Sequence, residues 1–246
     1  MLPSSRSVQV GVAATAFATI INAGPNTAFA AGISLASPIL ATFTYAQTSC
    51  ATNAVIRADN VPANIAPGGQ ACYVIAITPT APLAPTEVAF TFAGTNTDPV
   101  PTLIAINTLL MSASLTPVPD IVALAVTVTN DGILHLPGPA GTGAFAVATV
   151  NVGIGGLITA SANTGPIALP LALSICQTDP VIGVCISPIG PSVSVQINAG
   201  ATPTFAIFAT ASGAIVLDPA TNRIFVVFAD GGSVVRGRTS VAVSAQ

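Results

Sequence analysis

The sequence of 246 residues is poor in charge. It contains no lysine, its five basic residues are all arginine, and eight residues are acidic. Charged residues make up 5% of the chain, against roughly 25% in an average globular protein. Nucleic-acid binding rests on clustered lysine and arginine, and so does attraction to anionic lipid. The composition therefore argues against nucleic-acid partners and against a polybasic membrane anchor.

Long uninterrupted apolar runs are also missing, although hydrophobic residues make up 52% of the chain and the mean hydropathy is +0.81. A membrane-spanning helix needs about 20 mainly apolar residues without helix breakers. The best candidate runs from Val8 to Ile21 and ends at Asn22-Ala23-Gly24-Pro25. We therefore expect no membrane span.

Residues that carry catalysis are scarce. The single histidine, His135, is the only base for a Ser/His/Asp triad, with Asp120 or Asp131 as its partner. No nucleophile elbow of the G-x-S-x-G type is present. The acidic residues lie singly along the chain, unlike the paired carboxylates of glycoside hydrolases. We expect no enzyme and no cofactor, and His135 is the one residue through which a catalytic alternative would act.

Metal and sugar sites have little support. Calcium is the one metal that the oxygen ligands of Asp131 or Asp218 would suit, but no D-x-D-x-D run occurs. Sugar-binding platforms use exposed aromatic rings, and the chain has no tryptophan and two tyrosines. We therefore expect no metal site, and a surface glycan or a protein remains the alternative ligand.

The four cysteines form two local pairs by their spacing, Cys50 with Cys72 and Cys176 with Cys185. Four cysteines permit three connectivities, and short separations favour these two pairs. Neither spacing matches a CxxC metal knuckle. Two disulfides indicate an oxidising, extracellular compartment, while four buried free thiols are the alternative.

Alternation of apolar and polar residues predicts β-strands along most of the chain. Val88, Phe90 and Phe92 share one face of a strand, and the residues from Val122 to Val128 alternate in the same way. Asn130-Asp131-Gly132 then has the chemistry of a hairpin turn. Several short strands separated by turn residues predict an all-β fold, an antiparallel sandwich of the Ig type, in two sandwich domains.

Internal repetition suggests how the strands are grouped. The stretch from Ile197 to Gly232 contains INAGATPTFA and RIFVVFADG. INAGPNTAFA from Ile21, NIAPGGQACYVIAI near Ile65 and EVAFTFAG from Glu87 echo its parts. These echoes predict one sandwich from residues 31–101 together with 178–246, and a second, self-contained sandwich from 102–177. Residues 1–30 are then a separate N-terminal segment.

The segment 1–30 has two interpretations. Arg6, the apolar run after it and Ala28-Phe29-Ala30 are typical of a secretory signal with its cleavage site, whereas the repeated INAG motif favours retention. A retained segment is either an edge strand in its own subunit or a strand donated to a neighbouring subunit. The donation hypothesis assigns assembly contacts to six apolar residues: Val8, Val10, Val12, Phe17, Ile20 and Ile21.

The run from Asp120 to Gly165, with DIVALAVTVTNDGI, GTGAFAVATVNVG and ITASANTG, resembles the Ig-like β-sandwich repeats of large exported bacterial surface proteins. CQTDPVIGVC and RIFVVFADGGSVVRGRTSVAV resemble stretches that accompany such repeats, and the likeness covers about two thirds of the chain. The resemblance implies a sandwich fold, export, and service as a stalk, adhesin or assembly module. It carries over no catalytic residue, and the scarcity of charge departs from a simple soluble spacer.

These observations favour a structural subunit of an extracellular or cell-surface filament, sheath or layer, with copies of itself as partners. The alternative is an adhesive or ligand-binding module that uses the loops near Pro137 and Pro180. We expect Arg236 and Arg238 to solvate a sheet edge, or to pair with Asp230 or Asp218 across a subunit contact.

Overall fold

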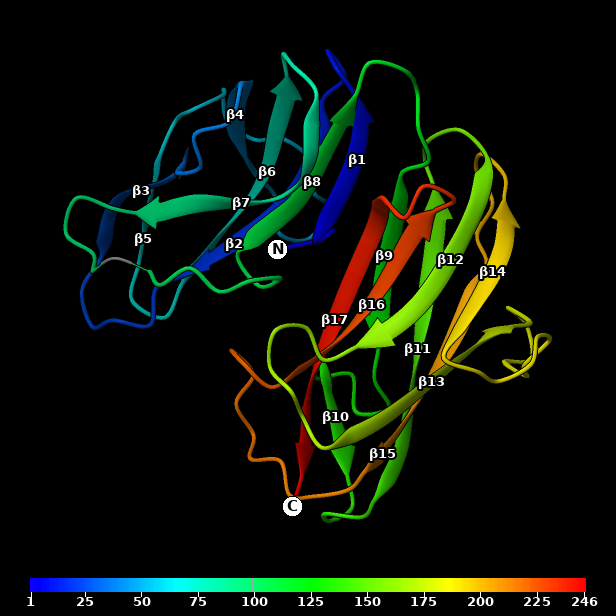
Figure 1. Ribbon diagram of the computed structural model, residues 1–246. Helices are drawn as coiled ribbons and strands as arrows, with labels where there is room; N and C mark the ends of the chain where they lie inside the picture. The colour runs from blue at the N-terminus through cyan, green and yellow to red at the C-terminus, as the bar shows by residue number, and fades with distance from the viewer. Residues whose placement is uncertain (99) are drawn as a thin grey trace. The chain divides into compact units, whose positions relative to one another are not determined.

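The computed structural model describes residues 1–98 and 100–246, and every regular element in them is a β-strand (Figure 1). The strands form four sheets, divided between unit 1, Met1–Thr116, and unit 2, Pro117–Gln246. Two facing sheets around an apolar core make each unit a sandwich, which confirms the all-β prediction. None of these residues forms a helix that could cross a membrane.

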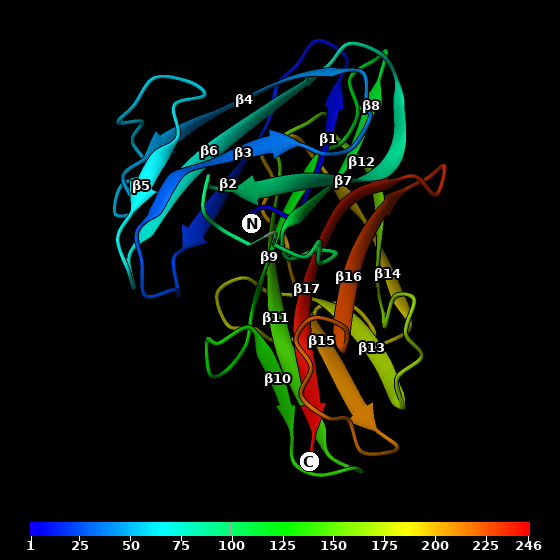
Figure 2. The same cartoon turned by 90° about the vertical axis from the view of Figure 1, so that its left-hand side faces the viewer.

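Unit 1 contains a five-stranded sheet in the order β1-β8-β7-β3-β5 and a three-stranded sheet in the order β2-β6-β4 (Figure 2). Its strands are β1 (Ser5–Gln9), β2 (Ala14–Ile21), β3 (Ala28–Leu35), β4 (Ala41–Thr48), β5 (Ala63–Ile65), β6 (Gln70–Pro79), β7 (Leu83–Ala93) and β8 (Thr108–Ser114).

Unit 2 contains a five-stranded sheet in the order β10-β17-β16-β12-β14 and a four-stranded sheet in the order β13-β15-β11-β9. Its strands are β9 (Ile121–Val126), β10 (Ile133–Leu136), β11 (Thr142–Asn151), β12 (Gly156–Asn163), β13 (Leu171–Thr178), β14 (Ser192–Ile197), β15 (Thr204–Ala211), β16 (Arg223–Asp230) and β17 (Val235–Ala245).

Unit 2 has the strand order of an Ig-type sandwich, in which strands A, B, E and D form one sheet and C, F and G the other. β9, β11, β15 and β13 take the places of A, B, E and D, and β12, β16 and β17 take those of C, F and G. One pair in each unit departs from a purely antiparallel sandwich, because β1 runs parallel to β8 and β10 runs parallel to β17.

The eight strands of unit 1 recur in unit 2, in the same chain order and the same sheet order, as β10 to β17. Hydrogen bonds recur with them. Ser7 of β1 bonds to Ser112 of β8, and His135 of β10 bonds to Ser244 of β17. Among the described residues, the strand that unit 2 has in addition is β9, which takes the A position.

This division corrects the predicted domains. The segments 31–101 and 178–246 do not build one sandwich, and 102–177 is not self-contained, because β14 to β17 pair with β9 to β13. Residues 1–30 supply β1, β2 and the start of β3 to unit 1. The similarity of EVAFTFAG to RIFVVFADG does mark equivalent strands, β7 and β16, but in two separate sandwiches.

The INAG repeat has a different origin. Asn22 follows β2 and accepts a bond from the Gly24 N–H, whereas Asn198 follows β14 and its carbonyl accepts from Ala201. The segment equivalent to INAGATPTFA is the one around Ile65, which joins β5 to β6 as Ile197 joins β14 to β15. Asn-x-Gly sequences suit turns of several kinds, so the repeated letters gave the wrong alignment.

The predicted alternation is present in both units. Val88, Phe90 and Phe92 of β7 are buried in unit 1, whereas in β9 Leu124 and Val126 face solvent and the other face lies in the core of unit 2. Ile75 and Ile77 of β6 are fully buried in unit 1, as are Val226 and Phe228 of β16 in unit 2. β16 lies between β12 and β17, so the apolar run RIFVVF is covered on both edges. The face of β16 opposite Val226 and Phe228 is also covered, because the Arg238 guanidinium lies 5.6 Å from the centre of the Phe225 ring.

One turn differs from its prediction. β9 ends at Val126, and Asn130 and Gly132 adopt positive φ in the turn that follows. The turn does not close a hairpin, because β9 belongs to the four-stranded sheet and β10 to the facing one. Turn chemistry fixes a change of direction, while the choice of sheet depends on partners distant in the sequence.

Candidate assembly surfaces

The structure places the six predicted assembly residues within unit 1. Val8 is buried in β1 opposite Ala113 of β8. Val10 and Val12 lie in the turn after it, and Val10 N–H bonds to the Ser114 carbonyl. This is the home-paired arrangement among the alternatives for the segment. Its exposed members are Val12, Phe17 and Ile21.

β2 carries three of the six predicted assembly residues, Phe17, Ile20 and Ile21, and forms an edge of its sheet. β6 pairs with it along one side, from Ala14 to Ile21. On the other side, within residues 1–98 and 100–246, no strand pairs with it. Two contacts of the described residues lie along it. Leu2 makes reciprocal backbone bonds with Phe17 of 2.9 and 2.7 Å, and the Arg6 guanidinium donates to the Thr15 carbonyl at 2.9 Å. An exposed edge of this kind offers unpaired N–H and C=O groups to a further strand.

An apolar groove follows this edge. It has a volume of about 320 Å³ and is bordered by β2, by the end of β7 and by the segment between β7 and β8. Its apolar walls include Ala18, Ile20, Phe92, Leu103 and Ile106. Met1 also lines it, and its amino group donates to the Ile106 carbonyl at 2.7 Å. The groove has no acidic or basic side chain in its lining.

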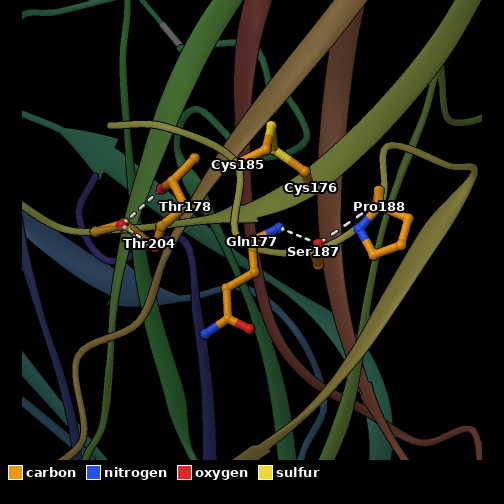
Figure 3. The surroundings of a disulfide bond; sticks show 7 residues. All are labelled: Cys176, Gln177, Thr178, Cys185, Ser187, Pro188 and Thr204. Carbon is orange, nitrogen blue, oxygen red and sulfur yellow. Dashed lines mark hydrogen bonds between the residues drawn. A yellow bond between two sulfur atoms is a disulfide. The ribbon is translucent and has the colours of Figure 1, made fainter. Parts of the chain in front are cut away.

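Both predicted disulfides are present, and they hold equivalent hairpins. Cys50–Cys72 ties the loop after β4 to β6, and Cys176–Cys185 closes the loop after β13 (Figure 3). In the second hairpin Ser187 Oγ accepts from the Gln177 N–H at 2.9 Å, and the Thr178 and Thr204 hydroxyls bond at 2.7 Å (Figure 3).

The tip of this second hairpin is apolar and exposed. Val181 is 89% and Ile182 70% exposed. The Asp179 carboxylate accepts the backbone N–H of both residues, at 2.8 and 3.2 Å, and so fixes the turn. Turn bonds and a disulfide therefore hold two large apolar side chains in solvent, next to Pro180, where the sequence predicted a binding loop.

The charged side chains serve structure within each unit. Arg236 Nε donates to Asp230 Oδ2 at 2.7 Å inside unit 2, which replaces the predicted pairing across a subunit contact. Burial alone would raise the pKa of Asp230, but bonds from Arg236 and from the Val234 and Gly232 N–H groups outweigh it and lower that pKa. Asp218 closes its own turn through Ala220 and Thr221, and these bonds lower its pKa.

His135 contacts an aspartate and a serine, the two residue types that accompany histidine in a Ser/His/Asp triad. Its Nε2 lies 2.9 Å from Asp131 Oδ2, and its Nδ1 lies 3.3 Å from Ser244 Oγ. The His135 hydrogen bond is the largest of the bonds that lower the pKa of Asp131. Ser244 is buried between strands, and the equivalent position in unit 1 is the Ser7–Ser112 bond. The contact therefore fits a bond that joins β10 to β17, and Asp120, the other predicted partner, lies before β9.

Asp131 and Asp218, the predicted calcium ligands, lie in separate turns of unit 2. Asp131 accepts from Thr129 and from the Ile133 N–H as well as contacting His135. Among the described residues, no group of three or more histidine, cysteine or acidic side chains is placed to hold a metal ion.

Comparison with known proteins gives structural neighbours. No family model matches the sequence, and no curated protein matches it. Among solved structures, the chain is similar to BcpA, the major pilin subunit of Bacillus cereus, with 10% identity and a TM-score of 0.30, over 98% of this chain and 69% of the pilin. It is also similar to the secreted serine protease VesC of Vibrio cholerae, with 10% identity and a TM-score of 0.28, over 97% of this chain and 48% of VesC, about half its length. At these values neither likeness bears on function.

Proposed function

We propose that the chain is a structural subunit of an extracellular filament, sheath or surface layer, built by association of identical copies. The single observation that carries the proposal is the open end of the β2 edge beside an apolar groove that no acidic or basic side chain lines. Natural sheets normally protect their edges with charge, proline or cover. β2 itself contains no charge and no proline between Ala14 and Ile21. Arg6 and Leu2 cover the edge at Thr15 and Phe17, and no described strand pairs with its end at Thr19 and Ile21.

The surface composition supports the same function. Large apolar side chains are exposed in both units, among them Ile21, Phe29, Val181 and Ile182. With 5% charged residues, the surface has few like charges to keep copies apart. Exposed apolar patches commonly mark sites of association, and burying them contributes about 25 cal/mol per Å². Two disulfides accord with an extracellular location.

Negative-stain electron microscopy of the native protein, with intact mass measured on the same sample, tests this function. Ordered fibres or sheets are the expected result. Dispersed monomers at every concentration would contradict it.

The apolar tip of the Cys176–Cys185 hairpin favours a second candidate, an adhesive or ligand-binding module. A rigid tip with Val181 and Ile182 exposed suits insertion into a pocket of a partner protein. In this case the chain stays monomeric, and replacing both residues by serine abolishes partner binding without affecting the state of association.

A further inference from the structure

Unit 2 shows what completes a sandwich of this kind. β9 pairs antiparallel with β11 from Ile121↔Asn151 to Val126↔Ala146. The pairing continues in the bond from the Val152 N–H to the Asp120 carbonyl, at 2.9 Å. Two β9 side chains that point inward, Ile121 and Ala123, are fully buried in the core. β9 therefore satisfies the outer edge of β11 and fills the end of the apolar core.

β2 of unit 1 corresponds to β11, and the two strands can be aligned residue by residue. Asn22 corresponds to Asn151, since the side-chain amide of each donates to the carbonyl that ends β5 or β14. Phe17 then corresponds to Ala146, and Leu2, which bonds to Phe17, takes the place of Val126. Within residues 1–98 and 100–246, Leu2 is thus the residue that pairs with β2 at the β9 position.

In unit 1, the apolar groove beside β2 lies where the rest of β9 lies in unit 2. Hydrogen bonding alternates along an antiparallel edge. Since Phe17 bonds outward and Asn22 N–H bonds inward to Gly69, the N–H groups of Thr19 and Ile21 point outward. Ala18 and Ile20 line the groove beside this edge. An incoming strand would therefore find backbone partners at Thr19 and Ile21 and an apolar space for its inward side chains.

We propose that the β2 edge of unit 1 accepts a β-strand from a second copy of this chain, in the position that β9 occupies in unit 2. The strand runs antiparallel to β2, is uncharged over about five residues, and places two apolar side chains at alternate positions in the groove, as Ile121 and Ala123 are placed. Strand addition of this kind gives affinity through backbone bonds and specificity through alternate side chains. The inference rests on the proposed function and names its contact.

Two features of the chain point to a second copy as the donor. The groove is neutral in its side chains, and this chain is unusually rich in uncharged β-forming stretches, with no charge from Val181 to Leu217. The chain also contains a strand of the required pattern, because β9 occupies the equivalent site of unit 2. β2, which the sequence suggested as a donor, is in this account the acceptor.

The test uses the intact chain and a fluorescent peptide with the sequence of residues 117–127 as the probe. A control peptide carries Ile121→Asp and Ala123→Asp. The acceptor variant is Ile21→Pro, which removes an outward N–H and is tolerated on an edge strand. Its matched control, Ile21→Ala, keeps the N–H. Fluorescence anisotropy measures peptide binding, and sedimentation velocity measures self-association with and without the unlabelled peptide.

The proposal expects the native peptide to bind, the control peptide not to bind, and excess native peptide to inhibit self-association. Ile21→Pro should weaken both peptide binding and self-association by roughly tenfold or more, while Ile21→Ala, which keeps the N–H and loses only apolar side-chain contact, should have the smaller effect on both. Far-ultraviolet circular dichroism verifies that both variants are folded.

Other outcomes overturn it in distinguishable ways. Association that persists unchanged in folded Ile21→Pro would contradict the acceptor edge and leave the structural function standing. Peptide binding without any effect on association would mean that the groove accepts a strand of another protein. A chain that binds the peptide but never self-associates would overturn both the second-copy donor and the proposed function.

Discussion

Asn22 and Asn151 hold the same place in two sandwiches. The Nδ2 of Asn22 donates to the Ile65 carbonyl at 2.9 Å, and the Nδ2 of Asn151 donates to the Ile197 carbonyl at 3.1 Å. They differ on the other side of the side chain. The Oδ1 of each accepts the N–H of the glycine two residues on, Gly24 or Gly153, but Asn151 Oδ1 also accepts the Asp120 N–H, which leads into β9. The same residue thus ends the B strand in both units and is tied to an A strand in unit 2.

The first prediction concerns Asn151, which is fully buried and makes hydrogen bonds through both polar atoms. Asn151→Ala leaves the Asp120 and Gly153 N–H groups without their acceptor, and each buried unsatisfied group costs about 1–3 kcal/mol. We expect the free energy of unfolding of unit 2 to fall by about 2–4 kcal/mol. Urea denaturation measures it, with Asn163→Ala on the surface as the control. A loss below about 0.5 kcal/mol, the range of surface substitutions, would contradict the role given to this side chain.

The second prediction concerns the packing of β9. A Cβ at Gly237 would lie 2.3 Å from the Ile121 carbonyl oxygen, so β9 approaches β17 where only glycine fits. Gly237→Ala should displace β9 and destabilise unit 2 by about 1–3 kcal/mol, and Ile121→Ala should cost about 2–5 kcal/mol through the cavity it leaves. Val128→Ala, at a position 94% exposed, serves as the control in the same thermal or urea titration. Equal stability of all three variants would show that β9 contributes no packing.

The third prediction concerns the disulfides. Chain entropy makes the stabilising effect grow with the length of the closed loop. Cys50–Cys72 spans 22 residues and Cys176–Cys185 spans 9. Replacing the first pair by alanine should destabilise unit 1 by about 3 kcal/mol, and replacing the second should destabilise unit 2 by somewhat less. Urea denaturation of each double variant provides the comparison. The opposite order would place the stabilisation in local contacts of the shorter hairpin.

The fourth prediction concerns acid stability. The pKa of Asp230 lies below its ordinary value in the folded protein, because Arg236 and two backbone N–H groups bond to the carboxylate. A depressed folded pKa contributes stability that is present above the unfolded pKa of about 3.9 and is lost as pH falls through the folded pKa. We therefore expect unit 2 to lose stability below about pH 4, and Asp230→Asn to reduce this loss while lowering stability at neutral pH. Melting temperatures from pH 2 to 7 measure both, and parallel curves for wild type and variant would contradict the assignment.

Much of the fold was predictable from local patterns. Alternation located β7 and β9, and the short spacing of Cys176 and Cys185 predicted their bond. The grouping of strands was not predictable in the same way. β9 and β10 flank a turn with hairpin chemistry and still join different sheets, because their partners lie far away in the sequence. Ile121 of β9 pairs with Asn151, and Ile133 of β10 pairs with Ala242.

The candidate site had a partial signal in the sequence. The sequence offers the uncharged segment from Val8 to Ile21 as a candidate assembly element, and its role depends on what lies beside it. That the edge at Thr19 and Ile21 is open becomes apparent when unit 1 is compared with unit 2, whose β11 is covered by β9. An open edge of this kind leaves no local pattern in the sequence, because it is seen only when the described strands of the two sandwiches are compared.

The most direct test of the central claim is a concentration series of the intact wild-type chain by sedimentation velocity. Our account predicts that the sedimentation coefficient rises with concentration toward large assemblies, and that Ile21→Pro shifts the transition to higher concentration. A single species of about 24.1 kDa across the whole series would contradict the claim.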